Sequence, residues 1–157
     1  MFRWFLNFLE RKGRKHVILD REGIKDYLIR YYILYPDSVK RERKDIPFNA
    51  FIHQFMASDD PVLHTHPWSW SASLILKGGY WEHLPTGKKW RGPGSFRILR
   101  RGKSDVHWIE IPEPGKTWTL FLRGRTVSSW GFMPDAKTKE VIPWREYLEQ
   151  HRVNASE

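Results

Sequence analysis

The sequence predicts an all-β fold, either a sandwich or a small barrel, from two observations. Short runs of β-branched and aromatic residues recur along the 157-residue chain, and the breaks between them contain Gly, Pro or Ser. Long segments with helical spacing are missing from the middle of the chain. Short strands separated by turn residues in this way are typical of sandwiches and barrels. With 40% hydrophobic residues, a chain of this length fits a single domain, residues 1–157.

A short amphipathic helix is predicted within residues 1–16. Its apolar residues at helical spacing are Phe2, Phe5, Leu6 and Leu9, and a basic cluster follows within residues 11–15. Such a helix either packs on the domain as a lid or contacts a membrane surface or a partner.

The β-barrel is predicted to occupy residues 17–132. Its strands cover residues 17–19, 27–35, 48–56, 74–77, 80–84, 90, 96–99, 106–111, 118–123 and 127–132. Residues 37–45 read as a charged connecting loop. Residues 133–157 form a tail in which helical spacing returns at Pro143 to His151.

The charge balance favours an anionic partner. The chain has 27 Lys and Arg against 18 Asp and Glu, a net charge of +9, with +5 in residues 1–47, +5 in 48–104 and −1 in 105–157. This excess of positive charge fits the binding of a small anionic substrate, or weak, salt-sensitive binding of nucleic acid. The sequence also leaves open whether the chain forms a homodimer. No apolar run reaches the roughly 18 residues of a membrane span, and no signal-peptide pattern is present, so we expect a cytoplasmic protein.

The histidines are the strongest chemical signal. Five of the seven lie between His53 and His107, and two form His64-Thr65-His66. In a strand, residues two apart point to one face, so these two imidazoles would aim at one point, and His107 offers a third ligand from a later strand. Because the chain has no Cys, a transition metal must be held by imidazole and carboxylate groups.

At these positions the sequence resembles the cupin superfamily, in particular small single-domain RmlC-like cupins and cupin-like proteins of bacteria and their phages. Cupins have a His-x-His motif before an apolar strand that ends in Gly, and then a Pro-Gly turn that opens a strand leading to a further His. The matching residues are His64, His66, Gly78 or Gly79, Pro93, Gly94 and His107. Over a core of about residues 48–132, the resemblance implies a double-stranded β-helix, or jelly roll. It also implies one divalent metal, Fe, Zn, Mn or Ni, held by His64, His66 and His107.

Glu82 is the main departure from the cupin pattern. Cupins usually place a Glu shortly after His-x-His, where this chain has Trp70 or Ser71. Glu82 is the next carboxylate along the chain after these positions. It either binds the metal as a fourth ligand, orients a ligand histidine from behind, or faces solvent. Strand alternation puts it on the face of Tyr80, which we predict to be the interior.

The sequence names candidate substrate-binding residues but no catalytic residue. Tyr80, Arg97, Arg123 and His53 lie on predicted strands or at their ends, where a barrel can direct them inward. For each arginine, exposure to solvent is the competing interpretation, and for His53 it is a hydrogen-bonded place in the core. The chain is interpreted either as a metal-dependent oxygenase, isomerase or lyase acting on a small anionic molecule, or as a non-catalytic module whose basic aromatic surface binds nucleic acid or an acidic partner.

Overall fold

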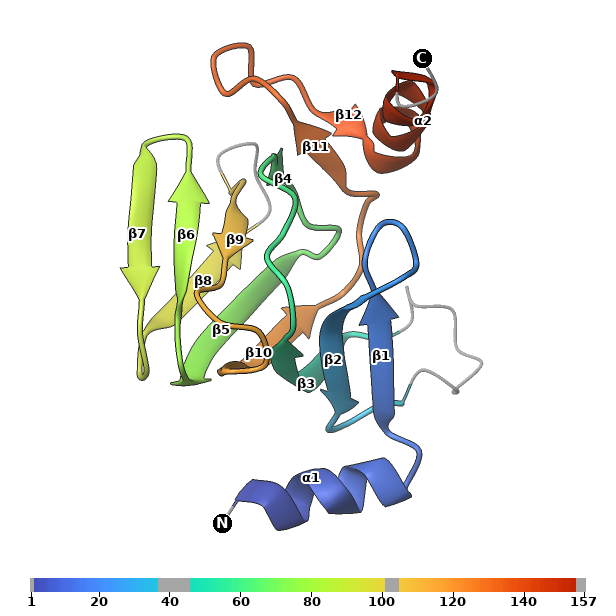
Figure 1. Ribbon diagram of the computed structural model, residues 1–157, viewed down its shortest axis with the longest axis vertical. Helices are drawn as coiled ribbons and strands as arrows, with labels where there is room; N and C mark the ends of the chain where they lie inside the picture. The colour runs from blue at the N-terminus through green and yellow to red at the C-terminus, as the bar shows by residue number, and fades with distance from the viewer. Residues whose placement is uncertain (1, 37–45, 101–104, 155–157) are drawn as a thin grey trace.

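The computed structural model describes residues 2–36, 46–100 and 105–154 of the chain (Figure 1). Within these ranges it contains two helices, α1 (Phe2–Arg11) and α2 (Trp144–Asn154). The strands are β1 (Lys15–Leu19), β2 (Asp26–Tyr32), β3 (Phe48–Phe55), β4 (Leu63–His64), β5 (Trp70–Lys77), β6 (Tyr80–Leu84), β7 (Gly87–Arg91), β8 (Phe96–Arg100), β9 (Trp108–Glu110), β10 (Thr117–Gly124), β11 (Gly131–Met133) and β12 (Ile142–Pro143). The loop predicted at 37–45 lies outside the described residues.

The strands form three antiparallel sheets. Six strands make the main sheet, in the order β1-β2-β3-β10-β5-β8, and two three-stranded sheets have the orders β12-β11-β4 and β7-β6-β9. In Figure 1 the β7-β6-β9 sheet lies along one side of the main sheet, while β11, β12 and α2 lie at the end of the molecule opposite α1. The predicted all-β jelly-roll architecture with a short helix near each end is confirmed.

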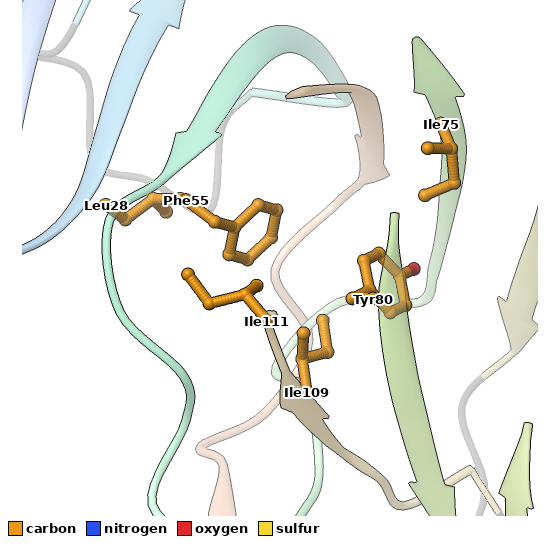
Figure 2. Packing of buried hydrophobic residues seen from close by; sticks show 6 residues of the cluster. All are labelled: Leu28, Phe55, Ile75, Tyr80, Ile109 and Ile111. Atoms are coloured by element: carbon orange, nitrogen blue, oxygen red, sulfur yellow. The ribbon is translucent and has the colours of Figure 1, made fainter. Parts of the chain in front are cut away.

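An apolar core joins the main sheet to the β7-β6-β9 sheet (Figure 2). Its buried members come from strands of both sheets and from the segment after β9: Leu28, Phe55, Ile75, Tyr80, Ile109 and Ile111. Burying such side chains is the dominant stabilising contribution, at roughly 1.5–3 kcal/mol for each large apolar group. The core occupies only one part of the interior, because the inner face of the main sheet becomes polar further along its strands.

Helix α1 covers the outer face of the main sheet. Leu6 and Leu9 are buried against Tyr31 of β2 and Ile52 of β3. The helix is shorter than residues 1–16, because Gly13, at φ +65°, ends it: the amides of Gly13 and Arg14 bond back to the carbonyls of Glu10 and Leu9. Neither helix in the described ranges has the length and apolar character needed to cross a membrane.

The turn between β5 and β6 requires a glycine at position 78. Gly78 has φ +75°, and a Cβ there would lie 2.6 Å from the carbonyl oxygen of Lys116. No side chain fits without moving the backbone of the neighbouring strand. The sequence pattern that ends the apolar strand in Gly therefore has a steric cause in this chain.

Candidate metal centre and its cavity

Three histidines meet at one end of the barrel. His64 ends β4 and His107 precedes β9, and their backbones form a bridge in which each amide donates to the other's carbonyl, at 3.0 and 3.3 Å. The ring centroids are 5.2 Å apart for His64 and His66, 5.4 Å for His64 and His107, and 5.0 Å for His66 and His107. The structure thus brings together the three residues on which the metal prediction depends.

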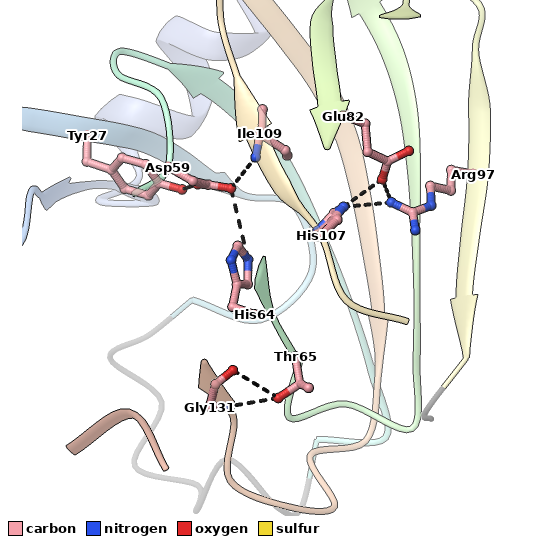
Figure 3. A network of polar contacts seen from close by, with 9 residues as sticks. All are labelled: Tyr27, Asp59, His64, Thr65, Glu82, Arg97, His107, Ile109 and Gly131. Atoms are coloured by element: carbon pink, nitrogen blue, oxygen red, sulfur yellow. Dashed lines mark hydrogen bonds and ion pairs between the residues drawn. The ribbon is translucent and has the colours of Figure 1, made fainter. Parts of the chain in front are cut away.

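The reason why His64 and His66 converge differs from the predicted one. Strand β4 ends at His64, so His66 lies beyond the strand rather than two positions along it. Thr65 makes the connection: its amide donates to the carbonyl of Gly131 at 2.9 Å, and its hydroxyl accepts from the Gly131 amide at 3.0 Å (Figure 3). This pair of bonds to Gly131, the first residue of β11, holds Thr65 in place between the two histidines.

The chemistry of the histidine cluster fits a divalent cation. One ligand nitrogen from each ring lies within 4.8 Å of the other two. Burial lowers the pKa of both His66 and His107 well below the usual value, so these rings stay in the neutral form that binds metals. The buried Nδ1 of His66 has no hydrogen-bond partner among the described residues, which is costly unless another group binds it.

Glu82 lies behind His107 (Figure 3). The carboxylate is fully buried, which rules out the solvent-facing interpretation, and its Oε1 lies 2.6 Å from His107 Nδ1. A carboxylate only accepts hydrogen bonds, so a His107 ring bonded to Glu82 carries its proton on Nδ1 and keeps the lone pair on Nε2. Arg97 Nη1, which also lies 2.6 Å from this Nδ1, only donates, and in this tautomer it pairs with Glu82. Glu82 is absent from the group of side chains in the described ranges whose donor atoms meet at one point. Its contacts match the interpretation in which it orients a ligand histidine.

Two arginines compensate the buried charge of Glu82. Arg91 donates to Oε2 at 2.8 Å, and Arg97 forms an ion pair with Oε1. Arg97 therefore points into the protein, but it faces Glu82 and His107 rather than the cavity. Desolvation lowers the pKa of the Arg97 guanidinium. The ion-pair cluster links β6, β7 and β8 to the segment that carries His107.

A second carboxylate, which the sequence analysis did not identify as a site residue, lies beside His64. Asp59 accepts a bond from the Ile109 amide at 2.7 Å and one from the Tyr27 hydroxyl, and its Oδ2 is 4.0 Å from His64 Nε2. Burial raises the pKa of Asp59, although these partners oppose the shift. In the sequence, Asp59 reads only as part of a turn, and no pattern in it indicates where that turn folds back.

A cavity of about 1070 Å³ opens beside the histidine cluster. His64 and His66 line it, together with Arg30 and Arg123 from the inner face of the main sheet. Its aromatic lining consists of Tyr27, Tyr32, Tyr35, Phe51, Trp68, Trp130, Phe132 and Trp144. Cavities with mostly apolar walls and a few polar groups are typical of small-molecule sites.

The four candidate substrate-binding residues lie in different environments, and not all of them line the cavity. Arg123 is buried and lines the cavity, where its Nη1 donates to the carbonyl of Gly124 at 3.2 Å. Tyr80 belongs to the apolar core and does not line the cavity. His53 is buried behind Arg30, whose Nε donates to its Nε2 at 3.0 Å. Arg30 was not among the sequence candidates, because nothing within its own strand indicates that it lies opposite His53 on β3.

Comparison with known proteins identifies the fold. No protein-family model and no curated protein matches the chain. Among solved structures, an RmlC-like cupin protein from Ralstonia eutropha has a TM-score of 0.51 at 11% identity, over 92% of this chain and 83% of its own. A protein with a double-stranded β-helix domain from Klebsiella pneumoniae has a TM-score of 0.50 at 14% identity, over 69% of this chain and 86% of its own.

A third similar structure is an enzyme. The DMSP lyase DddQ from Ruegeria pomeroyi has a TM-score of 0.57 at 15% identity, over 82% of this chain and 66% of its own. Identities this low establish a shared architecture and not a shared activity. On the topology of its sheets and these similarities, the chain has the double-stranded β-helix fold of the cupin superfamily.

Proposed function

We propose that this chain is a metal-dependent enzyme that acts on a small anionic molecule in the cavity beside His64, His66 and His107. The convergence of three imidazoles, each with a ligand nitrogen within 4.8 Å of the others, carries the proposal. A divalent ion held by three imidazoles keeps open coordination positions and acts as a Lewis acid toward a bound substrate oxygen. The reaction class we favour is that of an oxygenase, an isomerase or a lyase.

The protein's own groups prepare the site in this proposal. Glu82 holds the proton of His107 on Nδ1, so that Nε2 is available as a ligand. Asp59 stands beside His64, and Trp68 stacks on the His66 ring with centroids 5.5 Å apart. These contacts limit rotation of all three rings, and the aromatic walls of the cavity exclude water from a bound substrate.

The test is elemental analysis of protein purified without added metal. We expect about one divalent metal per chain, lost when His64 and His66 are both replaced by Ala. The matched control replaces His16 and His83 by Ala, which removes two histidines outside the cluster. Both variants should keep the β-rich circular dichroism spectrum, because the core is apolar. Protein that holds no metal after incubation with Fe²⁺, Zn²⁺, Mn²⁺ or Ni²⁺ would refute the proposal and leave metal-free proton transfer by His64 and Asp59 as the alternative.

One surface supports a second candidate function, a module that binds single-stranded nucleic acid. The pairing Trp81↔Trp90, His83↔Lys88 and His83↔Trp108 puts these five side chains on one face of the β7-β6-β9 sheet. Trp81 and Trp90 meet edge to face, His83 stacks on Trp108, and Lys88 lies 4.9 Å from the Trp81 ring centroid. Aromatic rings beside cations provide a stacking surface for bases.

Salt dependence tests this second function. A fluorescent oligonucleotide of mixed sequence should bind at low salt, weaken steeply as salt rises, and show little sequence preference. Replacing Trp81 and Trp90 by Ala should weaken binding by more than tenfold, whereas His16→Ala, at a histidine outside this sheet, should not. Absence of binding to RNA and single-stranded DNA at low salt would remove this candidate.

A further inference from the structure

We propose that Arg30 is the anion-binding residue of the cavity, held in place by His53, and that the cavity takes a carboxylate attached to a flat apolar body. The inference deepens the proposed function, since this ligand would be the substrate class of that site. Arg30 comes from β2 and lines the same cavity as His64 and His66.

The guanidinium of Arg30 is oriented but not neutralised. Its Nε donates to His53 Nε2, and its Cζ lies 4.9 Å from the Phe51 ring centroid. These contacts leave the two terminal nitrogens of the fork without a protein hydrogen bond in the described part of the chain. A guanidinium with two free parallel donors is the group that binds a carboxylate through two hydrogen bonds.

His53 is a positioning residue for Arg30. Its ring packs against both Phe51 and Phe121, with centroids 5.7 and 5.0 Å away. Burial, and secondly the charge of Arg30, lowers the pKa of His53 well below its usual value. The neutral ring keeps a lone pair on Nε2 and accepts from Arg30, whereas a protonated ring would repel the guanidinium. A buried neutral histidine is therefore well suited to aim this cation without cancelling its charge.

The other charges of the cavity wall already have partners. Arg21 forms an ion pair with Asp60 at 3.4 Å, and Asp59 accepts bonds from Tyr27 and from the Ile109 amide. Arg123, the other buried arginine of the cavity, donates through Nη1 to the carbonyl of Gly124. Among the described residues, Arg30 is thus an arginine of this wall whose two terminal nitrogens have no hydrogen bond to the protein. The single charge of the Arg30 guanidinium matches a ligand with one negative charge, such as a carboxylate, better than a doubly charged phosphate.

The body of the ligand is inferred from the aromatic walls. Phe51 lies beneath the guanidinium of Arg30. Trp68 stacks on the His66 ring and also contacts Phe121, with the Trp68 and Phe121 ring centroids 5.3 Å apart. Flat rings close to both the cation and the histidine cluster favour a flat apolar group over a sugar or a polyol.

Calorimetric titration with 2-naphthoate tests the inference. Two control ligands are titrated beside it: 2-naphthamide, which keeps the ring but lacks the charge, and acetate, which keeps the charge but lacks the ring. The protein is treated with a chelator, so that the result does not depend on metal. We expect 2-naphthoate to bind at least tenfold more tightly than either control ligand. Arg30→Ala should weaken binding by about 10- to 100-fold, and Arg30→Lys by less, because Lys keeps the charge but loses the fork. Arg100→Ala, at an exposed residue on β8, should change nothing.

A double-mutant cycle separates positioning from general damage. His53→Phe should weaken 2-naphthoate binding severalfold when Arg30 is present and have no effect in the Arg30→Ala background. Equal affinity of wild type and Arg30→Ala, or equal affinity for 2-naphthoate and 2-naphthamide, would overturn the inference. If the protein holds no metal but still binds 2-naphthoate through Arg30, the proposed function fails while this inference stands.

Discussion

Replacing Glu82 by Gln removes the charge at the centre of the most deeply buried ion-pair cluster in the described chain. The side chain is fully buried, while Arg91 and Arg97 are 17% and 14% exposed. Gln keeps the shape but leaves two guanidinium groups without a counter-charge and turns an NH₂ group toward one of them. Breaking a buried pair in this way costs about 3–5 kcal/mol. For a chain of this size, the melting temperature should fall by about 6–20 °C.

Glu110→Gln is the matched control for Glu82→Gln. Glu110 lies on the neighbouring strand and contacts His83 at 2.6 Å, but its side chain is 43% exposed. An exposed pair contributes up to about 1 kcal/mol, so this variant should melt within about 4 °C of the wild type. The assay is thermal and urea unfolding followed by circular dichroism, with metal content measured on the same samples.

Two outcomes decide whether the account of Glu82 is correct. A Glu82→Gln variant that unfolds like Glu110→Gln would show that the buried cluster does not stabilise the fold. Retention of metal with wild-type affinity would contradict its role behind His107, for which we expect a loss of about 10- to 100-fold. If Glu82→Gln does not fold, Glu82→Asp keeps the charge, and its loss of stability should be smaller.

Three further predictions concern pH, backbone and metal. Folding lowers the pKa of buried histidines including His53, because the folded protein disfavours their charged form. The free energy of unfolding should therefore hold above about pH 6.5 and decrease below it, by about 1.4 kcal/mol per pH unit for each such histidine. Unfolding at pH 7.5 and 5.5 should show this slope, and His53→Phe should reduce it; an unchanged slope would mean that His53 is not a source. Gly78→Ala should destabilise by about 2–5 kcal/mol through its left-handed backbone and the clash with Lys116, whereas Gly13→Ala, with no atom near its Cβ, should cost about 1–2 kcal/mol. Equal losses in urea unfolding would contradict the steric argument. Chelation should lower the melting temperature of metal-loaded wild type, since a ligand present at 1,000 times its dissociation constant stabilises by about 4 kcal/mol, and should not affect the His64→Ala/His66→Ala variant.

Much of the architecture could be predicted because strand type and turn type are local properties. The runs of β-branched and aromatic residues gave β6 at its observed bounds, residues 80–84. The predicted strand at 74–77 is too short, because β5 begins at Trp70. Near the start of β5, Ser71 and Ser73 face inward and lie opposite Arg123 and Phe121 of β10. A strand that presents serines to a polar interior has no apolar alternation to reveal it.

The parts of the site that were not predicted depend on register between distant strands. The contact between Arg30 and His53 arises because β2 and β3 place these residues opposite each other, and spacing within either strand does not indicate that pairing. Asp59 reaches His64 through the path of a loop. Arg97 and Arg123, for which exposure to solvent was the competing interpretation, are both directed inward, because Glu82 pairs with the first and the Gly124 carbonyl accepts a hydrogen bond from the second. Histidines could be identified from the sequence because they are rare and follow a known order.

The position of β10 between β3 and β5 has a consequence for how the chain folds during synthesis. Thr117–Gly124 pairs with Phe48–Phe55 on one side and with Ser71–Lys77 on the other. Until this late segment leaves the ribosome, β3 and β5 each have an edge with unsatisfied amides and carbonyls, the kind of surface that recruits other chains. The high contact order of these ladders also slows closure relative to local hairpins such as β6-β7. Nascent chains that end before Thr117 should therefore depend on chaperones, and in them His64 and His107 have no completed barrel to hold them together.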